Sequence, residues 1–225
     1  MPPKKGIATK HAIYRKIRQD IITGQKKPGE RLSVGNLKEE FGTSITPVRD
    51  ALQMLNQEDL VTIKPRSGYY VTLVTLKELY DMLEMREILE LAAAGMAAEK
   101  ITPEQIKALE SVHAGYTDEN EDSYSRYIEE NNRFHTLLAK SSGNDELAGQ
   151  IGRLHDRLAR FVVIARYGSY MIDTHQRLID RLKAHDPAGA KKVLKKEMDK
   201  AKIAIMEQVM RREAGTWHLG VSDRL

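Results

Sequence analysis

Six polar side chains between residues 75 and 212 of this 225-residue sequence interrupt the apolar faces of predicted helices. They are Arg86, Glu90, Asn131, His135, His175 and Glu197. A polar residue on an apolar stripe is more informative than one on a wetted face. Helical bundles build ligand and metal sites from inward-facing side chains of this kind. The six residues therefore predict a polar pocket inside a bundle, in which Arg86 would suit a carboxylate.

Each of these residues also has a purely structural interpretation. Arg86 and Glu90 stand four positions apart on one helix, so they could form a buried ion pair that fixes helix packing. His135 or His175 alone is more often a hydrogen-bonded core histidine. The remaining histidines, His155 among them, lack a comparable setting, and we assign them no function.

A second set of candidate residues lies in the first 74 positions. Thr46 is predicted to cap a helix that has Pro47 at its first position, where proline loses no hydrogen bond. Apolar residues then recur at helical spacing over 48–55 and predict a buried stripe. Ser44, Thr46 and Arg49 lie on the opposite side. Arg49 suits a guanine edge or a phosphate, and the two hydroxyls suit phosphate oxygens.

A hairpin is predicted directly after this helix. Residues 60–64 and 69–73 have strand character and flank a turn with a basic tip that holds Arg66 and Gly68. Two short helices, a tight turn and a hairpin, in that order, describe a winged helix-turn-helix, whose second helix enters the major groove. Arg66 and Gly68 would then let the backbone approach the minor groove. The alternative is a surface helix whose polar face meets only water.

Composition narrows the class of protein. Residues 1–74 carry 13 Lys and Arg against 7 Asp and Glu, although the formal net charge of the whole chain is only +4. A basic segment ahead of a slightly acidic remainder indicates a polyanionic partner for the first part. The absence of cysteine excludes disulfides, thiol catalysis and cysteine-ligated zinc. Without an apolar run of 18 residues or a signal-peptide core, we expect a cytoplasmic protein and no membrane partner.

These patterns predict a mainly α fold. We expect a winged helix-turn-helix DNA-binding domain over 1–74, an all-helical effector-binding and dimerisation domain over 75–212, and a tail over 213–225 with no assigned role. Helices of the first domain are predicted near 8–23 and 34–41, followed by the one that Thr46 opens. Those of the second are predicted near 76–100, 103–117, 122–141, 144–167, 170–184 and 187–212.

Two independent motif sets resemble one known family. The first set runs from Ile22-Thr23-Gly24 and Pro28-Gly29-Glu30-Arg31-Leu32 through Ser44–Leu52 to Gly68 and Val71. The second set comprises Arg86-x-x-Leu89-Glu90, Asn131-x-x-Phe134-His135, Gly143-Asn144-x-x-Leu147, and His175 with Asp186 and Ala190. Over about residues 8–210 the sequence resembles GntR-type transcriptional regulators of the FadR-like branch, whose helical effector domain has the FCD fold. Ile45 stands where that family usually has arginine, so a different operator sequence is expected.

The resemblance also implies a divalent metal. Metal-binding members of the family use one Asp and three His, with the Asp four residues before the first His and 22 positions between the last two. Asn131 and His135 keep the first spacing, and His175 and Glu197 keep the second. Two imidazoles with oxygen donors suit Zn²⁺, Ni²⁺ or Mn²⁺, which would anchor an effector and do no chemistry. The alternative is a metal-free pocket that binds an organic ligand directly.

The sequence thus predicts a ligand-responsive, sequence-specific DNA-binding regulator that is not an enzyme. One recognition helix reads only a few base pairs, so we expect a homodimer on an inverted-repeat operator. We expect a repressor, with an activator as the alternative, and the resemblance implies a small organic acid as the effector that releases it. A metal-dependent enzyme using His135, His175 and Glu197 is the second hypothesis, but no catalytic motif accompanies it. A helical scaffold is the third, and it leaves the inward polar groups unexplained.

Overall fold

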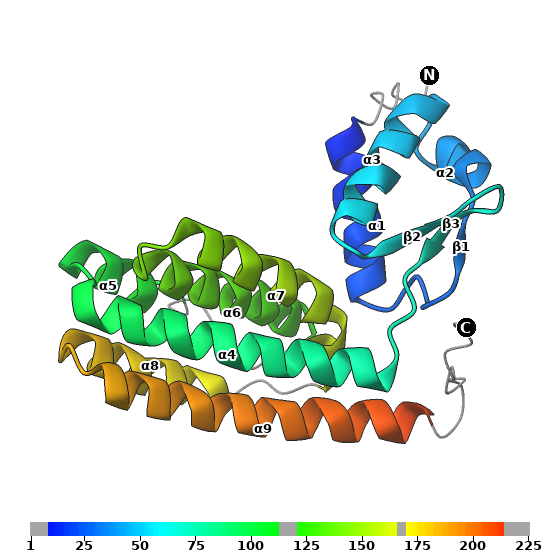
Figure 1. The fold of residues 1–225 in the computed structure, drawn as a ribbon. Helices are drawn as coiled ribbons and strands as arrows, with labels where there is room; N and C mark the ends of the chain where they lie inside the picture. Colours follow the sequence, from blue (N-terminus) through cyan, green and yellow to red (C-terminus); the bar gives the residue numbers. More distant parts are fainter. Residues whose placement is uncertain (1–8, 113–120, 166–169, 214–225) are drawn as a thin grey trace. The chain divides into compact units, whose positions relative to one another are not determined.

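The computed structural model describes residues 9–112, 121–165 and 170–213 of the chain. It divides into two compact units, residues 1–74 and residues 75–225 (Figure 1). The fold is mainly helical with one small sheet, as predicted. Residues 214–225 of the predicted tail, and residues 113–117 of the helix predicted over 103–117, lie outside the described residues.

The N-terminal unit combines three helices with a three-stranded sheet. Its elements are α1 (Lys10–Ile22), β1 (Arg31–Leu32), α2 (Val34–Glu40), α3 (Ile45–Gln57), β2 (Val61–Lys64) and β3 (Gly68–Val71). Isoleucines spaced four apart on α1 pack against the apolar face of α3, and together they form the centre of this core. Because α1 presents Ile13, Ile17 and Ile21 on one stripe, its orientation against α3 is fixed by burial.

The sheet holds one strand that the sequence analysis did not predict. Its strand order is β1-β3-β2 with antiparallel pairing throughout, and Arg31 of β1 faces Tyr70 of β3. Two residues are too few to show the alternation by which a strand is recognised. The added strand places a third basic residue, Arg31, beside the predicted hairpin of β2 and β3.

Among its described residues, the C-terminal unit consists of helices joined by short turns, with no strand. Its helices are α4 (Leu76–Lys100), α5 (Pro103–Glu110), α6 (Glu121–Ser141), α7 (Asp145–Ala165), α8 (Tyr170–Lys183) and α9 (Pro187–Glu213). Thr75 and Thr102 form capping boxes with Glu78 and Gln105, which explains why α4 and α5 begin where they do.

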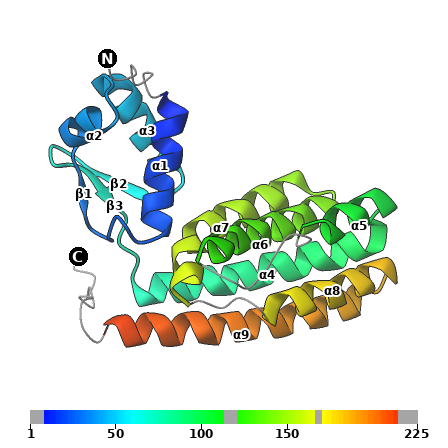
Figure 2. The ribbon, with the colours of Figure 1, turned by 180° about the vertical axis from the view of Figure 1, so that it is seen from behind.

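Helix α4 is the central element of this unit. In both views it runs beside α9, with α6 and α7 to one side and α8 next to α9 (Figures 1 and 2). The core between these helices is apolar and is formed chiefly by alanines of α4, Phe134 and Leu138 of α6, and leucines of α8 and α9. This packing brings the inward faces of α4, α6, α8 and α9 to a common interior. No helix in the described part of the chain is long and apolar enough to span a membrane.

Candidate functional site

The first candidate site is the exposed face of α3. Ser44, Thr46 and Arg49 are exposed, while the opposite side of the helix is fully buried through Val48, Ala51, Leu52 and Leu55. The prediction that Thr46 caps the helix is wrong, since the cap is Ser44 and α3 begins at Ile45. Pro47 therefore stands at the third helical position. It is tolerated there because the first four N–H groups of a helix have no intrahelical partner.

The hairpin tip forms the second part of this surface. Pro65, Arg66 and Ser67 separate β2 from β3, and the N–H of Ser67 donates to the carbonyl of Lys64 at 3.0 Å. Arg66 has a φ of 60° and Gly68 a φ of 114°, and the latter value strongly favours glycine. The tip is exposed and carries Arg66, while Lys64 lies over the Tyr70 ring at 4.6 Å.

Ile45 is the unusual residue of this surface. It is the first residue of α3 and is 44% exposed, between the hydroxyl-bearing Ser44 and Thr46. A large exposed apolar side chain at the N-terminus of a recognition helix can contact the methyl group of thymine in the major groove. The surface therefore combines cations, hydroxyls and one apolar side chain.

The second candidate site lies inside the helical unit. The six polar residues that were predicted to point inward are all buried, none being more than 5% exposed. Arg86 and Glu90 come from α4, Asn131 and His135 from α6, His175 from α8 and Glu197 from α9. The structure brings five of them within direct reach of one another, and Asn131 lies one helical turn before His135.

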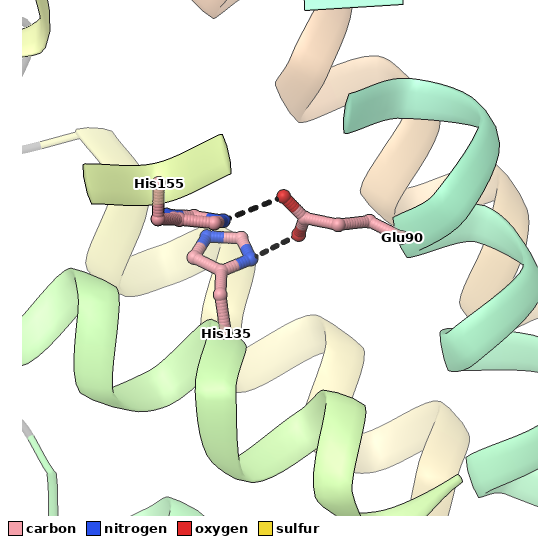
Figure 3. Close-up of side chains that lie close together, drawn as sticks. All are labelled: Glu90, His135 and His155. Atoms are coloured by element: carbon pink, nitrogen blue, oxygen red, sulfur yellow. Dashed lines mark hydrogen bonds and ion pairs between the residues drawn. The ribbon is translucent and has the colours of Figure 1, made fainter. Parts of the chain in front are cut away.

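Glu90 is the centre of one half of this cluster. Its carboxylate lies 2.6 Å from Nε of Arg86, 2.5 Å from Nδ1 of His135 and 2.7 Å from Nε2 of His155. Figure 3 shows His135 and His155 converging on the two oxygens of Glu90 from α6 and α7. Arg86 and Glu90 therefore do form the buried ion pair that was the structural alternative, but as part of a larger network.

His155 was missed by the sequence analysis. It is 5% exposed, and its Nδ1 lies 3.2 Å from Oδ1 of Asn132. A signal was available, because His155 stands four residues after Ile151 and three before Leu158, both of which are buried. Such spacing places it on the buried stripe of α7.

The buried charges set the protonation of these groups. Burial alone would lower the pKa of His135, but Glu90 and Glu197 outweigh it and raise that pKa to about 9. Burial, reinforced by Arg86, lowers the pKa of His155 to about 4. Burial opposes ionisation of Glu90, yet His135 and Arg86 hold its pKa well below the ordinary value. The network therefore contains a charged His135 and a neutral His155 at neutral pH in the absence of a metal.

The other half of the cluster gathers around Glu197. One of its oxygens lies 3.5 Å from Nε2 of His135 and 3.4 Å from Nε2 of His175. These three ligand atoms lie within 4.8 Å of one another, which is close enough to share one ion. The His175 ring stacks on Phe134 with a centroid distance of 3.8 Å, which holds the imidazole in place.

These residues fit a divalent metal on the Glu197 side. His135 turns Nδ1 to Glu90 and Nε2 to Glu197, an arrangement in which a carboxylate orients a metal-binding imidazole. Asn131 is 1% exposed, and its Oδ1 has no hydrogen-bond partner among the described residues. A buried oxygen without a partner, one helical turn before His135, could join the two imidazoles and the carboxylate, and Zn²⁺, Ni²⁺ or Mn²⁺ would accept such a donor set.

The Glu90 side does not suit a second cation, although its three ligand atoms also lie close together. Arg86 already places a guanidinium 2.6 Å from the carboxylate and 3.5 Å from Nε2 of His135. A metal there would stand beside this fixed positive charge. Arg86 instead adds a positive charge close to the proposed metal ligands, where a carboxylate of a small ligand would be favoured.

The fold and the two sites define a two-domain DNA-binding regulator. Residues 9–71 match the family model for bacterial regulatory proteins of the gntR family, and residues 81–200 match the model of the FCD domain. The chain therefore belongs to the GntR family, in the group that carries an FCD domain. The predicted resemblance is confirmed.

Relatives of known sequence and structure agree. The chain is 28% identical to the uncharacterised HTH-type transcriptional regulator YdhC of Bacillus subtilis, covering 80% of this chain and 83% of the relative. It is 27% identical to the HTH-type transcriptional repressor GlaR of Escherichia coli, covering 88% and 95%. The solved structure of Escherichia coli McbR matches with a TM-score of 0.73 at 25% identity, covering 91% of this chain and all of the other. These proteins are regulators, so the enzyme hypothesis is not supported.

Proposed function

We propose that this transcriptional regulator is a cytoplasmic repressor whose affinity for its operator changes when a small anionic effector binds in the helical unit. The observation that carries the proposal is the buried charged cluster of α4, α6, α7, α8 and α9. Burying so many charged groups in one place costs free energy unless they neutralise one another or bind a charged partner. A carboxylate of the effector would be bound by the cationic Arg86 and by a metal ion that the donor set around Glu197 holds.

The DNA-binding half of the proposal assigns base reading to α3 and minor-groove contact to the hairpin. Arg49 is exposed on α3, and Arg66 is exposed at the hairpin tip. Arg49→Ala should weaken binding to the specific site by roughly 1–3 kcal/mol if the guanidinium reads a base. Affinity should also fall steeply with salt, because bound cations are released from DNA. The measurement is fluorescence anisotropy with duplexes from the DNA flanking the protein's own gene.

A double variant makes this test decisive. Arg49→Ala with Arg66→Ala should lose site-specific binding, while Lys77→Ala with Arg153→Ala removes two exposed charges of the helical unit as a matched control. Full site-specific affinity in the first variant would contradict the assignment of this surface.

The metal half of the proposal assigns Asn131, His135, His175 and Glu197 as ligands. A bound divalent ion would supply a positive centre for an oxygen of the effector. The carboxylate of Glu197 supplies the negative charge that the amide of Asn131 lacks. Phe134, which stacks on His175, helps to exclude water from these ligands. The effector would contact Arg86, Glu90, Asn131, His135 and His175, with the metal as its anchor.

Elemental analysis of protein purified without a nickel column tests the metal directly. Close to one ion per chain is expected in the wild type, or uptake of one on adding Zn²⁺, Ni²⁺ or Mn²⁺. His135→Ala with His175→Ala should bind at least a hundredfold more weakly, because two of four ligands are lost. Less than about a tenth of an ion per chain with no uptake would reject the metal and favour the metal-free pocket.

A homodimer is the third part of the proposal. Ion pairs Glu84–Lys202 and Glu87–Lys195 show that α4 and α9 pack antiparallel. Residues one position further along each helix turn by about 100° to the same outer face. There the apolar side chains Met85, Ile88, Ile203 and Met210 are between 52 and 65% exposed. An apolar face shared by two helices is typical of a surface that another copy covers.

Light scattering on the full chain tests the dimer. We expect about twice the 25.5 kDa of one chain at tens of micromolar. Ile88→Glu with Ile203→Glu should give a monomer, whereas Ile63→Glu on β2, a less exposed isoleucine of the other unit, serves as a control and should leave the dimer intact. A strictly monomeric wild type would contradict the dimer, and a dimeric double variant would place its interface elsewhere.

A further inference from the structure

A cavity of about 420 Å³ opens between α8 and α9. Its outer lining is basic, with Arg177 and Arg181 from α8 and Lys192 and Lys196 from α9. The volume lies in the range of small-molecule sites. The cavity is formed by the helices that also supply His175 and Glu197 to the buried cluster.

Most of this positive charge is unpaired. Arg181 lies 3.4 Å from Asp186, whose carboxylate also accepts the N–H of Gly189 at 2.8 Å, so that acid is already engaged. Within the described part of the chain, Arg177, Lys192 and Lys196 make no ion pair with a carboxylate. A concave surface with several unpaired cations concentrates anions from solution.

The cavity also ends next to the buried cluster. Glu197 belongs to its lining although the residue is only 1% exposed, and the same side chain lies within 3.5 Å of His135 and His175. The basic groove therefore ends against Glu197 at the edge of the buried cluster, and the carboxylate oxygens of Glu197 are themselves covered.

We propose that this cavity is the entrance and second subsite for an effector with two anionic groups, such as a dicarboxylate or a phosphorylated carboxylate. One group would bind at the buried cluster, and the other would be held at the rim by Arg177, Lys192 and Lys196. This proposal rests on the proposed effector function and adds its charge requirement. A ligand with one anionic group would leave the rim cations unused and bind more weakly.

Matched probes test the charge requirement. Isothermal titration of the full chain compares succinate with butyrate, and 3-phosphoglycerate with glycerate, in the same buffer at constant ionic strength. We expect at least one probe with two anionic groups to bind ten times more tightly than its single-carboxylate counterpart. The two pairs distinguish a dicarboxylate from a phosphorylated effector. Equal affinities within both pairs, or no binding of either two-group probe at millimolar concentration, would overturn the proposal.

A register-shifted control tests the residues. Lys192→Gln with Lys196→Gln removes two rim charges, and Lys191→Gln with Lys195→Gln removes two charges one position earlier on α9, outside the cavity. Lys195 is there engaged by Glu87 and Asp199. The rim variant should lose at least tenfold in affinity for the tighter probe, and the control should stay within twofold of the wild type. Equal affinities in the two variants would overturn the assignment.

Measuring the release of operator DNA distinguishes a failure of the rim subsite from a failure of the proposed effector function. Both variants should bind operator DNA as the wild type does in the absence of ligand. A metabolite extract that releases the wild type and the rim variant equally would leave the effector function standing and overturn the rim subsite. Loss of DNA affinity in the rim variant, without loss of probe binding, would also overturn it.

Discussion

The two units of this regulator use polar residues in opposite ways. On α3 and the hairpin, Arg49 and Arg66 are exposed and have no role in the core, whereas Arg86 and Glu90 are buried among apolar side chains. A surface site for DNA costs the fold little, because its charges stay hydrated until the partner arrives. A buried site for a small ligand must balance its charges internally, which Glu90 does by meeting Arg86, His135 and His155 together.

This comparison implies that stability and function are separable in one unit and coupled in the other. Substitutions on the exposed DNA surface should change affinity and leave the free energy of unfolding nearly unchanged. Substitutions in the buried cluster should change both. The predictions below test that contrast, beginning with the largest expected effect.

Removing the carboxylate of Glu90 should cause the largest loss in the free energy of unfolding. Glu90→Ala leaves Arg86 and His135 buried without their counter-charge, and breaking a buried pair in this way costs about 3–5 kcal/mol. The matched control is Glu87→Ala on the same helix, which loses a partly exposed ion pair with Lys195 and should cost less than about 1 kcal/mol. Urea unfolding measures both. Equal losses would contradict the central role of Glu90.

The pH dependence of stability should show that His155 is buried in its neutral form. Its pKa is lowered to about 4 in the folded protein against an ordinary value near 6.5, so the unfolded chain binds more protons between these values. The stabilisation is thus present above pH 6.5 and lost as the pH falls towards 4, by up to about 3 kcal/mol. His155→Gln should flatten this acid limb. Thermal unfolding of the metal-free protein from pH 7.5 to 4.5 measures it, and an unchanged slope would contradict a buried neutral His155.

On the DNA surface a smaller effect should identify a base contact. Replacing thymine by uracil removes one methyl group, and losing its contact with Ile45 should cost about 0.8 kcal/mol, roughly fourfold in affinity. The wild type should be sensitive at one position in each operator half-site. Ile45→Ala should bind both duplexes equally. A uracil scan without any sensitive position would show that Ile45 does not read a thymine.

Periodicity and capping made most of the helical unit predictable. The predicted span 76–100 is the observed Leu76–Lys100, because Thr75 with Glu78 is a recognisable start and Thr102-Pro103 a recognisable break. The inward polar residues were found because each interrupts an apolar stripe. Their mutual distances were not predictable, since they depend on how four helices pack.

The errors have physical causes of the same kind. Strand β1 has two residues and is defined by its pairing with β3. No local sequence pattern could therefore predict it. The cap of α3 was misplaced because Thr46-Pro47 suits a helix start equally well by local rules, and the observed helix begins earlier at Ile45. The spacing of His155 on the apolar stripe of its helix could have indicated burial, but its contact with Glu90, 65 residues away in the sequence, could not be read from any local pattern.

The central claim is that one chain couples an exposed DNA-binding surface to a buried ligand-binding cluster. The most direct test is the operator affinity of wild type and His135→Ala, each measured with and without a small-molecule extract of the source cells. We predict that both bind DNA flanking the protein's own gene, that the extract weakens wild-type binding at least tenfold, and that His135→Ala does not respond. An equal response of both proteins, or no preference for this DNA over a scrambled duplex, would contradict the account.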